Sequence, residues 1–109
     1  MPDRPTELLK GTLDLLILRT LDLAPLHGAA IGERLSQTTR GTFQVKAGSL
    51  FPALHRLEQE GWIEGVWETS ADGRRIRVYT LTRTGRKQLA EEKANWARIT
   101  MAMARVLEA

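Results

Sequence analysis

The spacing of apolar residues changes twice along the 109-residue chain, and this change constrains the fold more than any other feature. Up to Gly61 the apolar residues recur three and four positions apart, which is typical of amphipathic helices. Residues 62–69 and 74–81 instead alternate between apolar and polar, as half-buried strands do, and the link between them contains the hairpin signal Asp72-Gly73. After the second strand the helical spacing returns. The pattern predicts a mainly helical chain with one β-hairpin.

Three helices are expected before the hairpin and one after it. Pro25 ends the first helix, and Gly61 is well placed as the left-handed residue that follows the third. Thr82 or Thr84 can cap the last helix. The expected helices span residues 9–23, 29–37, 47–60 and about 82–107.

This order of elements is that of a winged helix-turn-helix, in which the third helix enters the major groove of DNA. We expect residues 1–82 to form that DNA-binding domain. Residues 83–109 are expected to form a long C-terminal dimerisation helix.

Basic residues are concentrated where such a domain meets DNA. Although the net charge is only +3, residues 74–87 contain six Lys or Arg residues and no acid. A local basic block on a nearly balanced chain favours a polyanionic partner, here double-stranded DNA. The third helix presents short polar and basic side chains opposite its leucines, and a major groove admits such a helix. The residues predicted to face DNA are Lys46, Ser49, Pro52, Ala53 and Arg56 on that helix, Arg74, Arg75 and Arg77 on the hairpin, and Arg34 and Arg40 beside the turn.

The first and last helices carry more apolar surface than we expect one small chain to cover. The first helix has a second apolar face beside its main stripe, and the last has a heptad-like apolar seam. The first helix could also lie at the centre of its own domain, but we favour a second subunit, and hence a homodimer. The residues predicted at the dimer interface are Leu8, Leu15, Leu18, Leu89, Trp96, Ile99, Met103 and Val106.

The composition argues against several other classes of protein. No apolar run reaches the roughly 20 residues of a membrane span, and the leucine-rich start has no cleavage site typical of a signal peptide. The chain has no cysteine, which fits a cytoplasmic protein, and only two histidines, His27 and His55. These residues offer neither a metal-ligand set nor a catalytic triad. We therefore expect no metal, no cofactor and no enzymatic activity.

The sequence resembles the PadR-type transcriptional regulators over about residues 8–107. The resemblance implies a dimeric repressor that binds an inverted repeat upstream of its own gene or a neighbouring one, with release by an effector in some members. The single last helix is similar to that of the short-tailed branch of the family. The matching motifs are, in order, Gly11-Thr12-Leu13-Asp14, Leu26-His27-Gly28 with Ile31, Gly48-Ser49-Leu50-Phe51-Pro52-Ala53-Leu54, Arg56-Leu57-Glu58, Gly61-Trp62-Ile63, Arg75, and Tyr79-Thr80-Leu81-Thr82 with Gly85.

The chain departs from the family at Phe51, where a tyrosine hydroxyl often reaches a phosphate, and at Ala29, where an aromatic residue is frequent. Two alternative functions remain open. A winged-helix module for protein–protein contact would fit the weakly charged third helix and the five acids of residues 47–73. A sensor of small aromatic effectors stacked on Trp96 would match some relatives, although a place in the dimer core is the simpler role for this residue.

Overall fold

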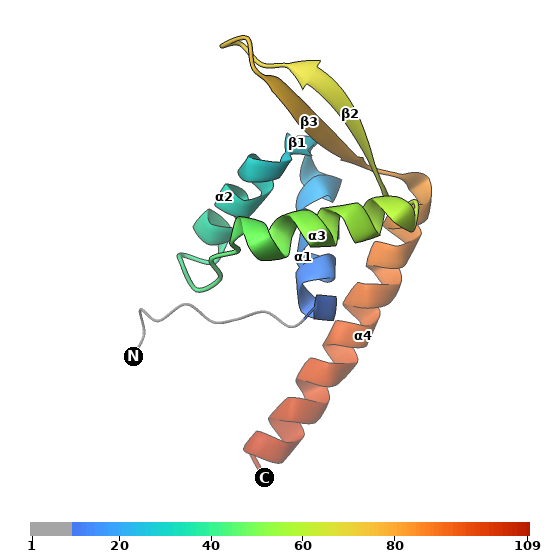
Figure 1. Cartoon of the computed structure of the whole chain (residues 1–109). Coiled ribbons are helices and arrows are strands. Elements are labelled where there is room, and N and C mark those ends of the chain that lie inside the picture. The colour runs from blue at the N-terminus through green and yellow to red at the C-terminus, as the bar shows by residue number, and fades with distance from the viewer. Residues whose placement is uncertain (1–9) are drawn as a thin grey trace.

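The computed structural model describes residues 10–109, which form four helices and a three-stranded antiparallel sheet around one apolar core (Figure 1). The predicted bounds of the helices and the hairpin are confirmed to within about one residue at each end. The elements are α1 (Lys10–Leu23), β1 (Leu26–His27), α2 (Gly28–Thr38), α3 (Ala47–Gln59), β2 (Ile63–Thr69), β3 (Arg75–Leu81) and α4 (Arg83–Leu107).

The short strand β1 was not predicted. Its two residues pair antiparallel with β3, Leu26 with Tyr79 and His27 with Val78, which gives the strand order β1-β3-β2. The side of β3 away from β2 would otherwise expose unpaired backbone groups, and the extended link between α1 and α2 satisfies them. The base of the hairpin is therefore tied directly to the start of α2.

Helix α1 lies at the centre of its own domain and contacts α2, α3, α4 and β3. Ile17 and Leu18 have no exposed surface, and Leu15 is 9% exposed. The prediction that Leu15 and Leu18 belong to a dimer interface is therefore wrong, because the other elements of the same chain cover them. Leu89, also predicted at the interface, is 5% exposed and belongs to the same core. The predicted contact Leu8 lies outside the described residues.

Local hydrogen bonds fix how α3, the hairpin and α4 are joined. Gly61 has a φ of +78°, and the N–H of Trp62 donates to the Leu57 carbonyl at 3.1 Å, so α3 ends at glycine as predicted. The Thr82 hydroxyl donates to the Gly61 carbonyl at 2.7 Å and accepts from the N–H of Gly85 at 3.0 Å. A Cβ on Gly85 would lie 2.0 Å from the Trp62 carbonyl oxygen, so only glycine fits at this crossing.

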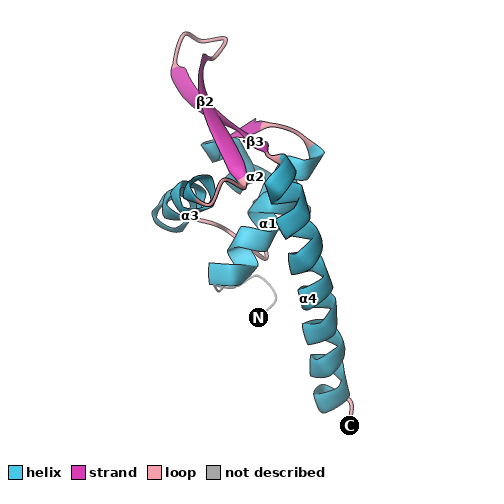
Figure 2. Ribbon diagram, turned by 90° about the vertical axis from the view of Figure 1, so that its right-hand side faces the viewer, coloured by secondary structure: helices cyan, strands magenta, loops and turns pink. Residues whose placement is uncertain are grey.

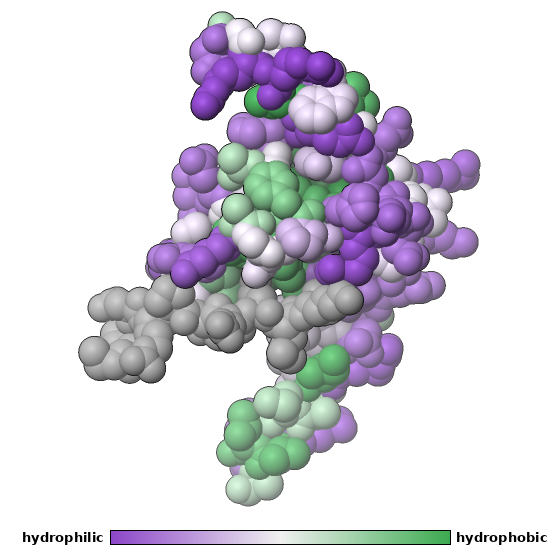
Figure 3. Space-filling view, in the orientation of Figure 1, coloured by the Kyte–Doolittle hydropathy of each residue, from purple (hydrophilic) through white to green (hydrophobic). Residues whose placement is uncertain are grey.

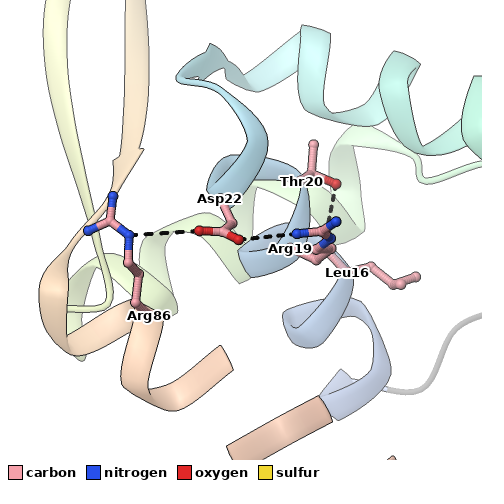
Figure 4. Close-up of polar contacts among 5 residues, drawn as sticks. All are labelled: Leu16, Arg19, Thr20, Asp22 and Arg86. Atoms are coloured by element: carbon pink, nitrogen blue, oxygen red, sulfur yellow. Dashed lines mark hydrogen bonds and ion pairs between the residues drawn. The ribbon is translucent and has the colours of Figure 1, made fainter. Parts of the chain in front are cut away.

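Helix α4 packs against α1 near its start and then extends away from the rest of the protein (Figure 2). At this junction Asp22 of α1 accepts a hydrogen bond from Arg19 at 3.1 Å and lies 3.7 Å from Nε of Arg86 on α4 (Figure 4). The buried Thr20 hydroxyl is satisfied by the Leu16 carbonyl at 2.7 Å. Arg86, part of the basic block, therefore faces an acid of its own chain.

Candidate nucleic-acid interface

The exposed face of α3 is almost uncharged. Leu50, Leu54 and Leu57 are buried as predicted, and Ala53 is buried with them at 1% exposure. The prediction that Ala53 faces DNA is wrong, because it lies three residues after Leu50 and four before Leu57, on the same side of the helix. The same spacing was available in the sequence. The side chains exposed on α3 are Ala47, Ser49, Phe51, Pro52, His55 and Gln59.

Arg56 is engaged within its own domain. Its guanidinium donates to the Asp14 carboxylate of α1, and the two side chains are only 31% and 14% exposed. The pair joins α3 to the central helix α1. Because its charge is already matched by a neighbour, Arg56 is a poorer phosphate ligand than an unpaired arginine. Its predicted contact with DNA stays a prediction.

Three exposed cations lie on α2 and in the connection between α2 and α3. Arg34 lies on α2, Arg40 lies in the turn, and Lys46 is the residue just before α3. The backbone of Arg40 has a φ of +52° and that of Gly41 a φ of +81°, which reverses the chain direction after α2. The three predicted residues are thus all exposed, and Lys46 directly precedes α3.

The three predicted arginines of the hairpin differ in their surroundings. Arg74 and Arg75 are exposed, whereas Arg77 is ion-paired with Glu58 of α3. The hydrogen bond that Arg77 donates to the Glu58 carboxylate raises the pKa of Arg77, so this guanidinium stays charged. The guanidinium carbons of Arg75 and Arg77 lie 5.0 and 5.4 Å from the centroid of the Trp67 ring. Arg74 and Arg75 are therefore better placed to contact a phosphate than Arg77, whose charge is already paired with Glu58.

The hairpin tip is ordered by its own side chains. The Ser70 hydroxyl donates to the Asp72 carboxylate, and the N–H of Arg74 donates to the same Ser70 oxygen at 3.2 Å. The hydrogen bond from Ser70 lowers the pKa of Asp72. Gly73 completes the turn with a φ of +85°. The acid of the tip is thus held inside the turn, and Arg74 follows it at the start of the returning strand.

An open groove of about 490 Å³ separates α3 from the hairpin. Burial is the main cause that raises the pKa of its tyrosine, Tyr79, and the tyrosine is 6% exposed. Phe51 is 47% exposed, and its ring leaves no room for a Cβ on Gly28, which would lie 2.6 Å from Phe51 Cε1. The residues that line the groove are Phe51, His55, Glu58, Gln59, Arg77 and Tyr79.

The outer part of α4 exposes apolar side chains over several turns. Four of the residues predicted at a dimer interface lie here: Trp96, Ile99, Met103 and Val106 are 48%, 42%, 55% and 76% exposed. Figure 3 shows hydrophobic side chains gathered at this end of the molecule. A pocket around Trp96 would need a second subunit, since the protomer leaves this helix face open. The structure therefore leaves an aromatic ligand at Trp96 as a prediction.

The part of the chain that the structure describes contains no group of three or more His, Cys, Asp or Glu side chains able to hold a metal ion. Within residues 10–109, likewise, no helix has both the length and the apolar character needed to cross a membrane.

Comparison with known proteins agrees with this arrangement. Residues 17–91 match the transcriptional regulator PadR-like family. An uncharacterised protein X of Lysinibacillus sphaericus is 30% identical over 94 residues, 86% of each chain. The transcriptional regulator Rv3488 of Mycobacterium tuberculosis is 40% identical over 68 residues, which are 62% of this chain and 60% of that one.

A solved structure supports the same assignment. The PadR-like transcriptional regulator of Bacillus cereus superposes with a TM-score of 0.80 at 29% identity, over 95% of this chain and 99% of its own. The matched family region includes the second half of α1, the whole helix-turn-helix, the hairpin and the start of α4. The chain belongs to the PadR-like family of transcriptional regulators.

Proposed function

We propose that this regulator is a dimeric repressor that binds an inverted repeat in promoter DNA. The observation that carries the proposal is the placement of five exposed cations on two sides of a nearly uncharged recognition helix. They are Arg34 on α2, Arg40 and Lys46 in the connection from α2 to α3, and Arg74 and Arg75 on the hairpin.

Each part of this surface has its own task in the proposal. The neutral face of α3, with Ser49 and Pro52, enters the major groove and reads base edges and groove shape. The cations on either side neutralise phosphates of the flanking backbone, which fixes the position of the helix without reading sequence. Sequence recognition and affinity are thus supplied by different residues.

Dimerisation supplies the second half-site. The proposal divides the chain at residue 82 into a DNA-binding part and the helix α4, whose exposed apolar seam packs against a second copy. Two recognition helices related by a two-fold axis then reach successive major grooves about one helical turn apart, which matches an inverted repeat. Repression follows in the simplest way, because a dimer bound across a promoter excludes other proteins from that DNA.

Fluorescence anisotropy with the DNA immediately upstream of its own coding region tests the proposal. We expect a specific complex at nanomolar protein and a steep salt dependence, since ten phosphate contacts per dimer give a slope of about −9 in log K against log salt. Arg74→Gln should reduce the magnitude of this slope by about two units, one contact in each protomer.

Arg98→Gln is the matched control, because it removes one positive charge from the exposed surface of α4, away from the proposed interface with DNA. It should leave binding unchanged. Binding that barely varies between about 50 and 200 mM salt would refute the phosphate contacts. An absence of DNA binding would favour the protein–protein module.

A further inference from the structure

The indole of Trp67 is a large apolar side chain on the surface of the hairpin, and its ring is in contact with two cations. The side chain is 55% exposed, and the guanidinium carbons of Arg75 and Arg77 lie 5.0 and 5.4 Å from the ring centroid. Both distances are within the roughly 6 Å over which a cation is attracted to an aromatic face. We call these three residues the wing stack.

The strand register shows which way the wing stack faces. Trp67 is opposite Arg77, and Ile63 is opposite Leu81, four residues nearer the base on the same strands. Because side chains alternate along a strand, these four residues share one face of the hairpin. Ile63 and Leu81 are buried in the core, and Arg77 is ion-paired with α3. The wing stack therefore lies on the face turned towards α3.

Gly65 makes room for one of the two arginines. A Cβ at this position would lie 2.5 Å from Nε and 2.9 Å from Cζ of Arg77. The Arg77 guanidinium thus lies over Gly65, ion-paired with Glu58 and beside the Trp67 ring. Its charge is matched and its position is fixed. Arg77 supports the stack from one side.

Arg75 differs from Arg77 in a way that matters for binding. It is exposed, and within the described part of the chain its contact is the Trp67 ring, with no carboxylate partner. A guanidinium stacked on a ring keeps N–H donors available for bidentate contact with a phosphate. Stacking also restricts a long side chain before binding, so less conformational freedom is lost in the complex.

We propose that Trp67 is a positioning residue that presents Arg75 to a DNA phosphate. The inference rests on the proposed DNA binding. When α3 is in the major groove and the hairpin lies over the neighbouring minor groove, the backbone strand between the two grooves runs along the hairpin face turned to α3. Trp67 holds Arg75 on that face. Its loss should weaken binding by about 3- to 10-fold for each hairpin, or about 10- to 100-fold for a dimer.

A double-mutant cycle separates positioning from other roles. Trp67→Leu and Arg75→Gln are each expected to weaken binding to the same DNA, measured by anisotropy at fixed salt. In the Arg75→Gln protein, Trp67→Leu should have no further effect, because the cation that it positions is gone. Trp67→Phe keeps an aromatic face, so this variant should retain most of the affinity that Trp67→Leu loses.

Three results would overturn the inference. One is a Trp67→Leu protein that binds as tightly as the unmodified protein, with Trp67→Phe unchanged as well. Another is an equal loss in the Arg75→Gln background, which would mean that Trp67 contacts DNA itself or only holds the hairpin together. The third is an absence of DNA binding by the unmodified protein, which refutes the proposed function too and so differs from the first two results. Circular dichroism of each variant confirms that the fold is retained.

Discussion

The most informative single change for the proposed dimer is Trp96→Ala. Trp96 is 48% exposed, and since a tryptophan offers up to about 250 Å², about 120 Å² of it is left uncovered. At about 25 cal/mol per Å², complete coverage by a partner would contribute about 3 kcal/mol per protomer. If a partner covers half of that area in both protomers, the substitution costs about 3 kcal/mol per dimer, which raises the dimer Kd about 100-fold.

Sedimentation over a dilution series measures this Kd directly. Met101→Ala is the matched control, because Met101 is 58% exposed on the same helix but about 140° around it from Trp96. It should change the Kd by much less than Trp96→Ala. The reasoning is refuted if Trp96→Ala leaves self-association unchanged, or if Met101→Ala disrupts it equally.

Three further predictions follow from the core, the hairpin and its tyrosine. Leu18→Ala should reduce the free energy of unfolding by about 2–5 kcal/mol in urea titrations. A change no larger than the error of the measurement would contradict the burial of α1 at the centre of the core. Glu58→Gln releases Arg77, so DNA affinity should rise several-fold and the salt slope should steepen by about 0.9 per protomer; weaker binding would show that the ion pair is needed. Tyr79 is the only tyrosine, and burial raises its pKa, so its phenol should ionise at higher pH in the folded than in the unfolded chain. Its contribution to stability is present below about pH 10 and is lost as the pH rises through the folded pKa. As the pH rises above about 10, the free energy of unfolding of the Tyr79→Phe protein should therefore fall less than that of the unmodified protein.

Most of the secondary structure could be predicted from local sequence. The glycine that ends α3 and the Asp72-Gly73 turn each act within a few residues, so neighbouring letters are enough to place them. The strand β1 could not be found in this way. Leu26 and His27 carry no alternating pattern, and they become a strand because β3, about fifty residues later, offers an unpaired edge.

The sequence predicted which charged residues belong to the candidate site. It did not show which of them are free of an ion pair within the chain. Arg56 and Arg77 read like Arg74 and Arg75 in the sequence, yet their carboxylate partners lie 42 and 19 residues away. A basic residue shows its charge in the sequence, whereas its ion pairs depend on which elements pack together. The stack of Arg75 on Trp67 was missed for the same reason, since the two residues are on different strands of the hairpin.

The sequence alone determined where each helix and the two strands of the hairpin lie, because apolar period, caps and turn residues act locally. It also determined that α4 carries an apolar seam over its last turns. Only the tertiary structure decided what covers the apolar faces of α1. Two apolar sides are compatible with a dimer interface or with a central position, and the choice depends on how completely elements distant in sequence surround the helix. Helices α2, α3 and α4 and strand β3 contact α1, so Leu18 is buried within the chain and cannot contact a second subunit. Of the two described helices predicted to dimerise, α4 is the one that keeps a long apolar face exposed.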